Sequence, residues 1–308
     1  MIQPSFSLVT FDDIPLLKKY IQTCQYQESN HNLINIFTWQ TLFPVYKYIN
    51  EHYVLLISKH KDLIFLYMPL CKPEYVDQAL LEGRKLFKQA QIPFVMSTYT
   101  QAMKDHALTL FPTMHVCTAR DSDDYVYEKE KLITLSGKKH QKRRNLYNKF
   151  LREYEGRVQL VAIHSRILEV CQFFMEHAEE VEDEYLHHER TGILHVLTHL
   201  DVFDHQGAAL LIDQVVKGFI ITSTIDEQMV QVNIEKADKS IPGIYQYMES
   251  EYFKMFYPDV QYINKEDDMG RPNLRKAKLA NKPIKMITKY RLCEEVCDAC
   301  KSESDQQE

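Results

Sequence analysis

Glycine is scarce in this sequence, with eight in 308 residues, and long apolar runs are missing. No apolar stretch approaches the roughly 20 residues that a membrane-spanning helix needs. The first residues, MIQPSFSLVTFDDIPLL, lack the basic segment, apolar core and cleavage site of a signal peptide. The seven cysteines are an odd number spread along the chain, which does not suggest a disulfide framework. These absences predict a soluble, cytoplasmic protein.

Several signatures of catalysis are also missing: there is no Ser-His-Asp arrangement, P-loop, Rossmann glycine pattern or HExxH motif. His188, His195 and His199 stand at helical spacing, but no acidic ligand lies between them, so solvated or packed histidines are favoured over zinc. The three cysteines of LCEEVCDACK, residues 292–301, leave a metal or redox pair open, although tail thiols are favoured. We therefore predict no metal and no required cofactor.

Charge is unevenly distributed along the chain. The formal net charge is -6, which is not that of a general nucleic-acid binder. Between Lys131 and Arg152, however, there are eight Lys or Arg residues and no acid, whereas residues 176–189 carry seven acids. The basic segment is therefore a candidate contact for an anionic partner.

Apolar periodicity predicts one order of elements twice: a strand, two helices, antiparallel strands, a helix, a strand, a helix and a strand. This order builds an α/β (α+β) fold whose mixed, mostly antiparallel sheet has helices on both faces. Its repetition predicts two tandem domains, residues 1–128 and 129–308, with a flexible tail after about residue 293. The order resembles the GNAT acyltransferase fold in tandem.

A basic helix is predicted between the two domains, at about residues 138–154. Its polar face carries the basic residues, while apolar side chains such as Phe150 lie opposite. The helix is either a solvated connection or a site for the phosphates of a lipid headgroup or RNA.

Glu235 ends an alternating strand in which Val230, Val232 and Ile234 are predicted to point to the opposite face. A carboxylate there would open into the groove where acceptor and donor meet and could take a proton from an attacking amine or hydroxyl. An exposed glutamate at a strand end is the alternative.

The turn after that strand reads EKADKSIPGIYQYMES, with Gly243 as its only glycine. In acyltransferases of this fold, backbone N–H groups at this turn cradle the donor's pyrophosphate. The usual acyl-CoA loop with two closely spaced glycines is absent, which weakens an acyl-CoA prediction.

The segment NKEDDMGRPNLRKAKLANKP, residues 264–283, places three adjacent acids before a helix that Pro272 can begin. Acids complement the start of a helix, but a cap does not need three. They are expected to pair with Arg271, Arg275 and Lys278 or to bind an ammonium group.

ITLSGKKHQKRRNLYNKF, VNIEKADKSIPGIYQYMESEYF and INKEDDMGRPNLRKAKLANKPIKMITKY resemble stand-alone bacterial relatives of the C-terminal domain of phosphatidylglycerol lysyltransferases. The family pattern falls on Asn264, Glu266, Asp267, Asp268, Gly270, Leu274, Arg275 and Lys278. The resemblance implies a tandem GNAT fold related to Fem-type aminoacyltransferases, which move an amino acid from its tRNA ester to an amine or hydroxyl.

The leading hypothesis is an aminoacyltransferase or N-acyltransferase, active in its second domain, that uses aminoacyl-tRNA and modifies an anionic lipid or cell-envelope precursor. Peripheral membrane contact is compatible with this hypothesis. Alternatives are an acyl-CoA-dependent N-acyltransferase and a non-catalytic module that binds an anionic ligand. The predicted catalytic residues are Glu235 and Asp267; the substrate-binding residues are Asn264, Glu266, Asp268, Arg275, Lys278, Gly243 and Tyr245; the phosphate-binding residues are Lys138, Lys139, Lys142, Arg143 and Arg144.

Overall fold

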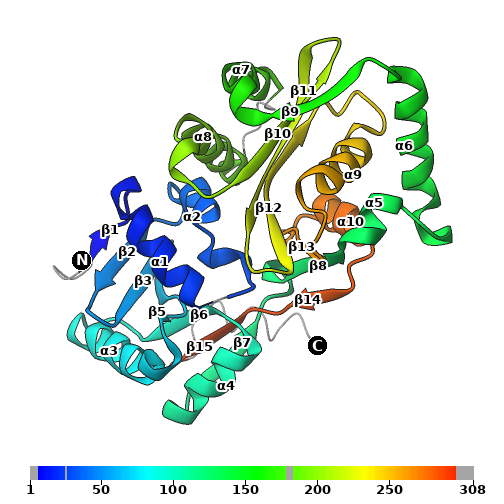
Figure 1. The fold of residues 1–308 in the computed structure, drawn as a ribbon. Helices are drawn as coiled ribbons and strands as arrows, with labels where there is room; N and C mark the ends of the chain where they lie inside the picture. The colour runs from blue at the N-terminus through cyan, green and yellow to red at the C-terminus, as the bar shows by residue number, and fades with distance from the viewer. Residues whose placement is uncertain (1–5, 25, 178–182, 296–308) are drawn as a thin grey trace. The chain divides into compact units, whose positions relative to one another are not determined.

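The computed structural model describes residues 6–24, 26–177 and 183–295. The chain divides into two units (Figure 1). The first unit comprises Met1–Asp124 together with Ile287–Glu308, and the second comprises Tyr125–Met286. Each unit is built on its own β-sheet.

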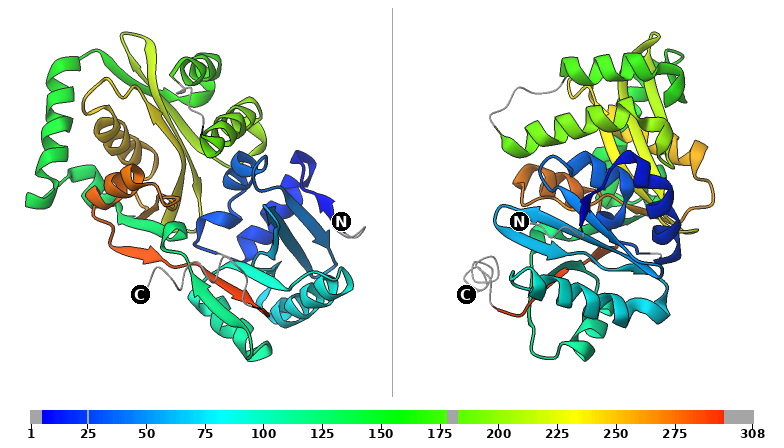
Figure 2. Two further views of the ribbon diagram at one scale, coloured as in Figure 1. Left: turned by 180° about the vertical axis from the view of Figure 1, so that it is seen from behind. Right: turned by 90° about the vertical axis from the view of Figure 1, so that its left-hand side faces the viewer.

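The first unit has a sheet in the order β1-β2-β3-β4-β6-β15-β7, with β5 paired to β3. Figure 2 shows α1 and α2 on one face of this sheet and α3 and α4 on the other. Alternation along β3 explains this, because Leu55 and Ile57 join the core beneath α3, while Val54 and Leu56 are buried on the other face. The elements are β1 (Ser7–Leu8), α1 (Ile14–Cys24), α2 (Leu33–Trp39), β2 (Val45–Ile49), β3 (Tyr53–His60), β4 (Leu63–Leu66), β5 (Leu70–Cys71), α3 (Val76–Gln89), β6 (Val95–Tyr99), α4 (Gln101–Leu110), β7 (His115–Thr118) and β15 (Tyr290–Cys293).

The second unit has a sheet in the order β14-β8-β13-β12-β11-β10-β9, with α7 and α8 on one face and α9 on the other (Figure 1). Its core beneath α9 includes Phe150, Met248 and Phe253. The elements are β8 (Asp124–Glu128), α5 (Lys129–Thr134), α6 (Gln141–Tyr154), β9 (Val158–Ala162), α7 (Ile167–His177), α8 (Glu184–Thr198), β10 (Gln206–Ile212), β11 (Val215–Thr224), β12 (Met229–Ala237), α9 (Ile244–Phe256), β13 (Tyr262–Asn264), α10 (Pro272–Ala280) and β14 (Lys285–Ile287).

The predicted repeat of element order is confirmed, since each sheet is built by a strand, two helices, a meander, a helix, a strand, a helix and a strand. In the first unit the sequence predicts only a hairpin, formed by residues 52–60 and 62–70. The structure adds β2 to these strands, so the first unit also has a three-stranded meander. In the second unit the sequence predicts the second helix at residues 189–200, whereas α8 begins at Glu184. Asp183 caps α8 by accepting a hydrogen bond from the Leu186 N–H.

The last predicted strand, residues 284–292, is two strands that belong to different sheets. β14 lies at the edge of the second unit's sheet, whereas β15 pairs with β6 and β7 in the first. In the same way, β8 falls in the expected first domain, 1–128, yet it pairs with β13 in the second unit's sheet. The division therefore differs from the expected one, 1–128 and 129–308, because backbone pairing of these short strands, not chain order, assigns them to a sheet.

Among the described residues, no helix is both long and apolar enough to cross a lipid bilayer. The expected flexible tail after about residue 293 falls mostly outside the described residues.

Candidate functional site

In the second unit, two neighbouring strands part from one another. β12 and β13 are parallel and pair from Met229 with Tyr262 to Gln231 with Asn264. Beyond Gln231, β12 continues to Ala237 with β11 as its ladder partner, and in these strands no further ladder pair joins it to β13. Side chains that follow the last pair on each strand can therefore meet between the diverging backbones.

A β-bulge decides which way Glu235 points. Ile221 pairs with Ile234 and Thr222 with Val232, so Asn233 is an extra residue in β12. The predicted alternation is therefore wrong beyond Val232: the bulge turns Glu235 to the α9 side, the same side as Val232, instead of the opposite one. In agreement, Glu235 pairs with Lys265, which also pairs with Glu249 of α9. The neighbouring Lys236 pairs with Glu189 of α8 on the other face.

Glu235 belongs to a chain of four alternating charges. Its carboxylate lies 2.7 Å from the Lys265 ammonium, which lies 2.8 Å from Glu249 of α9. Glu249 in turn accepts a hydrogen bond from Arg143 of α6 at 2.9 Å. The side chains are 2–13% exposed, so these charges are held in a low-dielectric region where each depends on its partners.

The two carboxylates of this chain differ in acidity. Burial raises the pKa of Glu235, and the negative charge of Glu249 adds to the rise, although Lys265 opposes it. Burial also acts against the charged form of Glu249, but Lys265 and Arg143 together bring its pKa below the usual value. Of these two carboxylates, Glu235 is therefore the one that more readily accepts a proton.

The acidic segment after β13 is part of the fold, and its three acids have different roles. The side chain of Asn264 is fully buried and accepts the N–H of Glu266. Glu266 has a left-handed backbone (φ 59°) and accepts a hydrogen bond from Gln231 at 2.7 Å. Asp267 accepts the N–H of Met269 in a turn. Glu266 and Asp267 are half-buried, so an ammonium-binding role for them stays a prediction.

For Asp268 the sequence left two possibilities, pairing with the basic residues of this segment or binding an ammonium group, and the structure shows the pairing with Arg275. Its side chain is fully buried and makes a two-pronged ion pair with Arg275, at 2.8 and 2.7 Å, and a hydrogen bond with Tyr125. Burial acts against the charged form, but these donors bring the pKa of Asp268 below its usual value. Asp268 therefore holds the segment to α10.

The substrate-binding roles predicted for Arg275 and Lys278 stay predictions, because both cations already contact other parts of the second unit. Arg275 is bound to Asp268, as described above. The Lys278 ammonium donates to the backbone carbonyls of Lys265 (2.5 Å) and Asp267. These two cations therefore fix the loop that carries Lys265.

The basic helix divides into an outward and an inward set. Lys138, Lys139 and Lys142 are exposed and remain candidates for contact with phosphates. Arg143 points inward to Glu249, and Arg144 donates to the backbone carbonyl of Leu135 at 2.5 Å. Both guanidinium groups already have partners in the fold, so the phosphate-binding role predicted for Arg143 and Arg144 stays a prediction.

Gly243 and Tyr245 lie where β12 leads into α9. The backbone of Gly243 is left-handed (φ 91°), and a Cβ there would be 2.8 Å from the carbonyl carbon of Leu146 in α6. The backbone of α6 therefore lies directly on the start of α9. The Tyr245 hydroxyl is near both the N–H (3.1 Å) and the C=O (3.2 Å) of Ala237, and burial raises its pKa to about 12.

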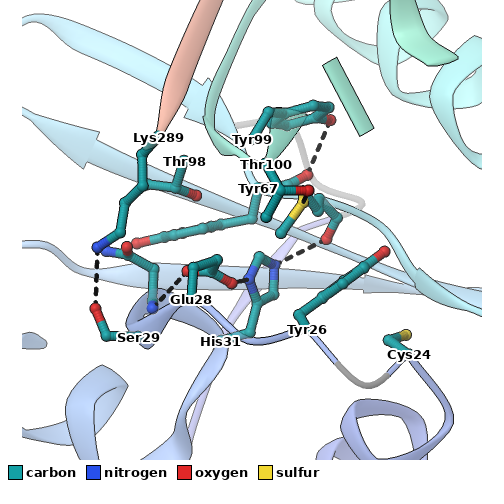
Figure 3. A network of polar contacts seen from close by, with 12 residues as sticks. Cys24, Tyr26, Glu28, Ser29, His31, Tyr67, Thr98, Tyr99, Thr100 and Lys289 are labelled. Atoms are coloured by element: carbon teal, nitrogen blue, oxygen red, sulfur yellow. Dashed lines mark hydrogen bonds and ion pairs between the residues drawn. The ribbon is translucent and has the colours of Figure 1, made fainter. Parts of the chain in front are cut away.

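The first unit holds a different buried polar network, shown in Figure 3. His31 contacts the carboxylate of Glu28 with Nδ1 and the carbonyl of Met68 with Nε2, at 3.0 Å. Lys289 of the chain's last segment lies 2.6 Å from Asp124. The sequence prediction singled out none of these residues.

The carbonyls of the segment after β4 face donors in this network. Tyr99 donates to Tyr67 (3.2 Å) and His31 contacts Met68, as Figure 3 shows. Tyr26 donates to Pro69 (2.7 Å). These side chains therefore fill the place in the first unit that corresponds to the parting of β12 and β13.

The two units correspond residue by residue where their parallel strands part. β4 and β6 are parallel at Leu66 with Met96, and Thr98, two residues later, is left-handed (φ 66°) like Glu266. By this alignment Ser97 stands where the second unit has Lys265. Of these two corresponding sites, only the one in the second unit therefore has the buried row of alternating charges.

Comparison with known proteins was decisive for the family. The family model described as "Phosphatidylglycerol lysyltransferase, C-terminal" matches residues 22–293. The chain belongs to this family. An uncharacterised protein of Mycoplasmoides gallisepticum is 26% identical over 172 residues, which is 55% of this chain and 55% of that protein. The chain therefore spans about half the length of that curated relative.

Solved structures of similar proteins agree with the fold. A conserved protein of unknown function from Bacteroides thetaiotaomicron has a TM-score of 0.83 at 24% identity and covers 95% of this chain and 99% of its own. The C-terminal domain of a protein described as a lysylphosphatidylglycerol synthetase, from Agrobacterium fabrum, has a TM-score of 0.64 at 11% identity, covering 97% and 96%. L-PGS from Bacillus licheniformis has a TM-score of 0.60 at 13% identity, covering 91% of each chain.

These findings confirm the predicted fold class, two tandem GNAT-like acyltransferase domains with mixed sheets. Family and fold together indicate an acyltransferase domain. Members of this fold differ in chemistry, so donor and acceptor have to be argued from the site.

Sequence reasoning selected Glu235 but missed its partners Lys265 and Glu249. One signal was present for Glu249: it lies on the stripe of α9 formed by Met248, Tyr252 and Phe253, all fully buried. An acid on the apolar stripe of a helix requires a buried partner. No comparable signal marks Lys265, which stands next to three acids.

The histidines and cysteines considered as metal ligands do not assemble in this way. Within residues 6–24, 26–177 and 183–295, no group of three or more His, Cys, Asp or Glu side chains could hold a metal ion. Cys293 is buried in β15, and Cys297 and Cys300 lie outside the described residues.

Proposed function

We propose that this chain transfers an aminoacyl group from aminoacyl-tRNA to an amine or hydroxyl acceptor, such as an anionic lipid or cell-envelope precursor. We further propose that the second unit performs the reaction. The observation that supports this most is the position of Glu235. It is an acid of raised pKa, 12% exposed, held by Lys265 where β12 and β13 diverge.

In the proposed reaction, the acceptor nitrogen or oxygen attacks the carbonyl carbon of the aminoacyl ester. Glu235 accepts the acceptor's proton as the new C–N or C–O bond forms. The C–O bond to the tRNA ribose then breaks, and the proton returns to the ribose oxygen. Lys265 keeps Glu235 ionised beforehand and places a fixed positive charge near the developing oxyanion.

Two features of α6 and of the 3-10 helix before it (Lys138–His140) favour aminoacyl-tRNA over acyl-CoA as the donor. Lys138, Lys139 and Lys142 present exposed positive charge, which suits an RNA or lipid phosphate. The carbonyl of Leu146 meanwhile lies against Gly243 at the start of α9, where acyl-CoA enzymes of this fold need open backbone N–H groups. The inner network of the first unit supports a scaffolding role for that unit.

The test uses tRNA charged with radiolabelled amino acids, offered with phosphatidylglycerol vesicles or with a lipid-linked cell-wall precursor. We expect label to move into the organic phase, and Glu235→Gln to slow this by about 10²–10⁴-fold, which is the usual contribution of a general base. Glu251→Gln, on the outer part of α9, is the matched control and should retain activity because Glu251 pairs with the exposed Lys254.

Three outcomes would contradict the proposal. Transfer that is unaffected by Glu235→Gln would remove Glu235 from the reaction. Thermal stabilisation by acetyl-CoA, but not by charged tRNA, would favour the acyl-CoA-dependent enzyme instead. Binding of charged tRNA or vesicles without transfer to either acceptor would favour a non-catalytic binding module.

A further inference from the structure

Two histidines that are far apart in sequence meet at the edge of the second unit's sheet. His164 belongs to a 3-10 helix (Ile163–Arg166) that follows the edge strand β9, and His205 directly precedes β10. Their Nε2 atoms are 3.0 Å apart. Sequence reasoning did not select them, because 41 residues separate them.

The other nitrogen of each ring faces an oxygen atom that can only accept a hydrogen bond. Nδ1 of His205 lies 3.0 Å from the carbonyl of Phe203, and Nδ1 of His164 lies 3.2 Å from the carboxylate of Asp201. The Phe203 carbonyl places a hydrogen on Nδ1 of His205, and the Asp201 carboxylate, although 90% exposed, favours the tautomer of His164 that carries its hydrogen on Nδ1. In the neutral rings, both Nε2 atoms then present lone pairs to each other across 3.0 Å, which is repulsive unless a cation lies between them.

We propose that Nε2 of His164 and Nε2 of His205 together bind a divalent transition-metal ion of the Zn²⁺ or Ni²⁺ class, with water completing its coordination. Imidazole nitrogen suits these ions, and metal–nitrogen bonds of about 2.0–2.1 Å place two ligands about 2.9 Å apart at the right angles that Ni²⁺ adopts and about 3.3 Å apart at the tetrahedral angle of Zn²⁺. The observed separation is 3.0 Å.

Asp201 and the carbonyl of Phe203 serve as orienting groups in this site. A metal-binding histidine commonly donates its second N–H to a carboxylate or a backbone carbonyl, which fixes the tautomer and aims the other nitrogen at the metal. Both histidines show this arrangement. His164 is half exposed, so an ion can reach the site from solvent.

A bound ion would join the end of β9 to the start of β10, which pair from Ala162 with Ala208. Its expected effect is to stabilise the edge of the sheet. In the sheet order β11 lies between this pair of strands and β12, which carries Glu235, so the metal site does not depend on the proposed transferase reaction.

The test uses the untagged full chain carrying Cys297→Ser and Cys300→Ser, so that these two thiols do not contribute. The protein is freed of metal with EDTA, transferred to chelator-free buffer at pH 7.5 and titrated calorimetrically with ZnCl₂, NiCl₂ or MgCl₂. We expect one Zn²⁺ or Ni²⁺ per chain, a rise in melting temperature and no response to Mg²⁺.

Variants separate a built site from incidental histidines. His164→Asn and His205→Asn should each abolish the binding, and Asp201→Asn should weaken it by about 10–100-fold, as expected for an orienting carboxylate. His195→Asn is the matched control, because the rings of His195 in α8 and of His199 directly after α8 are also neighbours, at 5.0 Å between centroids. Circular dichroism checks that each variant is folded.

The proposal is wrong if the wild-type chain binds no more Zn²⁺ or Ni²⁺ than the double variant, or if His195→Asn weakens binding as much as His205→Asn does. A proton shared between the rings, seen by NMR titration with no response to metal, would also overturn it, because a proton would then explain the contact.

Discussion

Lys265→Met is the most informative single change in the second unit, because one ammonium group serves two buried carboxylates. Lys265 lies 2.7 Å from Glu235 and 2.8 Å from Glu249, and its own side chain is 12% exposed. Methionine keeps much of the length but leaves both acids without this cation. Removing one partner of a buried ion pair costs about 3–5 kcal/mol, and we expect a loss in this range.

The stability that Lys265→Met loses should depend on pH in a defined direction. The pKa of Glu235 is already raised by burial and by Glu249, and removing the opposing charge of Lys265 raises it further above its unfolded value. A group with a raised folded-state pKa contributes stability below its unfolded pKa and loses it as pH rises through the folded pKa. The difference between wild type and variant should therefore be large at pH 7–8 and shrink toward acid.

Urea unfolding of both proteins at several pH values measures this difference. Lys236→Met is the matched control, because Lys236 lies three residues after Asn233 in the same strand and makes a comparable 2.8 Å ion pair with Glu189, at 32% and 27% exposure. Such partly exposed pairs contribute about 0–1 kcal/mol. Equal losses in the two variants, or a loss for Lys265→Met that does not change with pH, would refute the role assigned to Lys265.

Two further predictions concern the supports of the site. Gly243→Ala should lower the stability of the fold by about 1–2 kcal/mol for the left-handed backbone and by a further ~1–3 kcal/mol for the clash with Leu146. Gly156→Ala is the control, because Gly156 is also left-handed (φ 72°) but has no atom within 4 Å of its Cβ. In thermal unfolding it should show only the backbone cost. Asp268→Asn should cost about 1.5–3 kcal/mol at neutral pH by weakening the pair with Arg275. Because the folded-state pKa of Asp268 is lowered, its stabilisation is present above the unfolded pKa and is lost as pH falls through the folded pKa, so this cost should vanish in acid. A constant cost across pH 2–7 would contradict the assignment.

Much of the fold was predictable from the sequence because it follows from local patterns. The alternation of Leu55 and Ile57 with Val54 and Leu56 requires a strand buried on both faces, and the repeated element order requires two similar sheets. Charge segregation likewise located the basic helix. Each of these inferences uses side chains a few residues apart, whose relative directions are set by the backbone geometry of a helix or strand.

The tertiary structure alone decided what depends on distant residues. One extra residue, Asn233, turned Glu235 toward α9 and gave it Lys265 and Glu249 as partners. The sheet to which β15 belongs depends on the backbone hydrogen bonds offered by β6 and β7, not on the strand's own sequence. The meeting of His164 with His205 has the same origin. Sequence periodicity records which face of an element is buried, but a long-range partner is selected by packing and hydrogen bonding across the whole sheet.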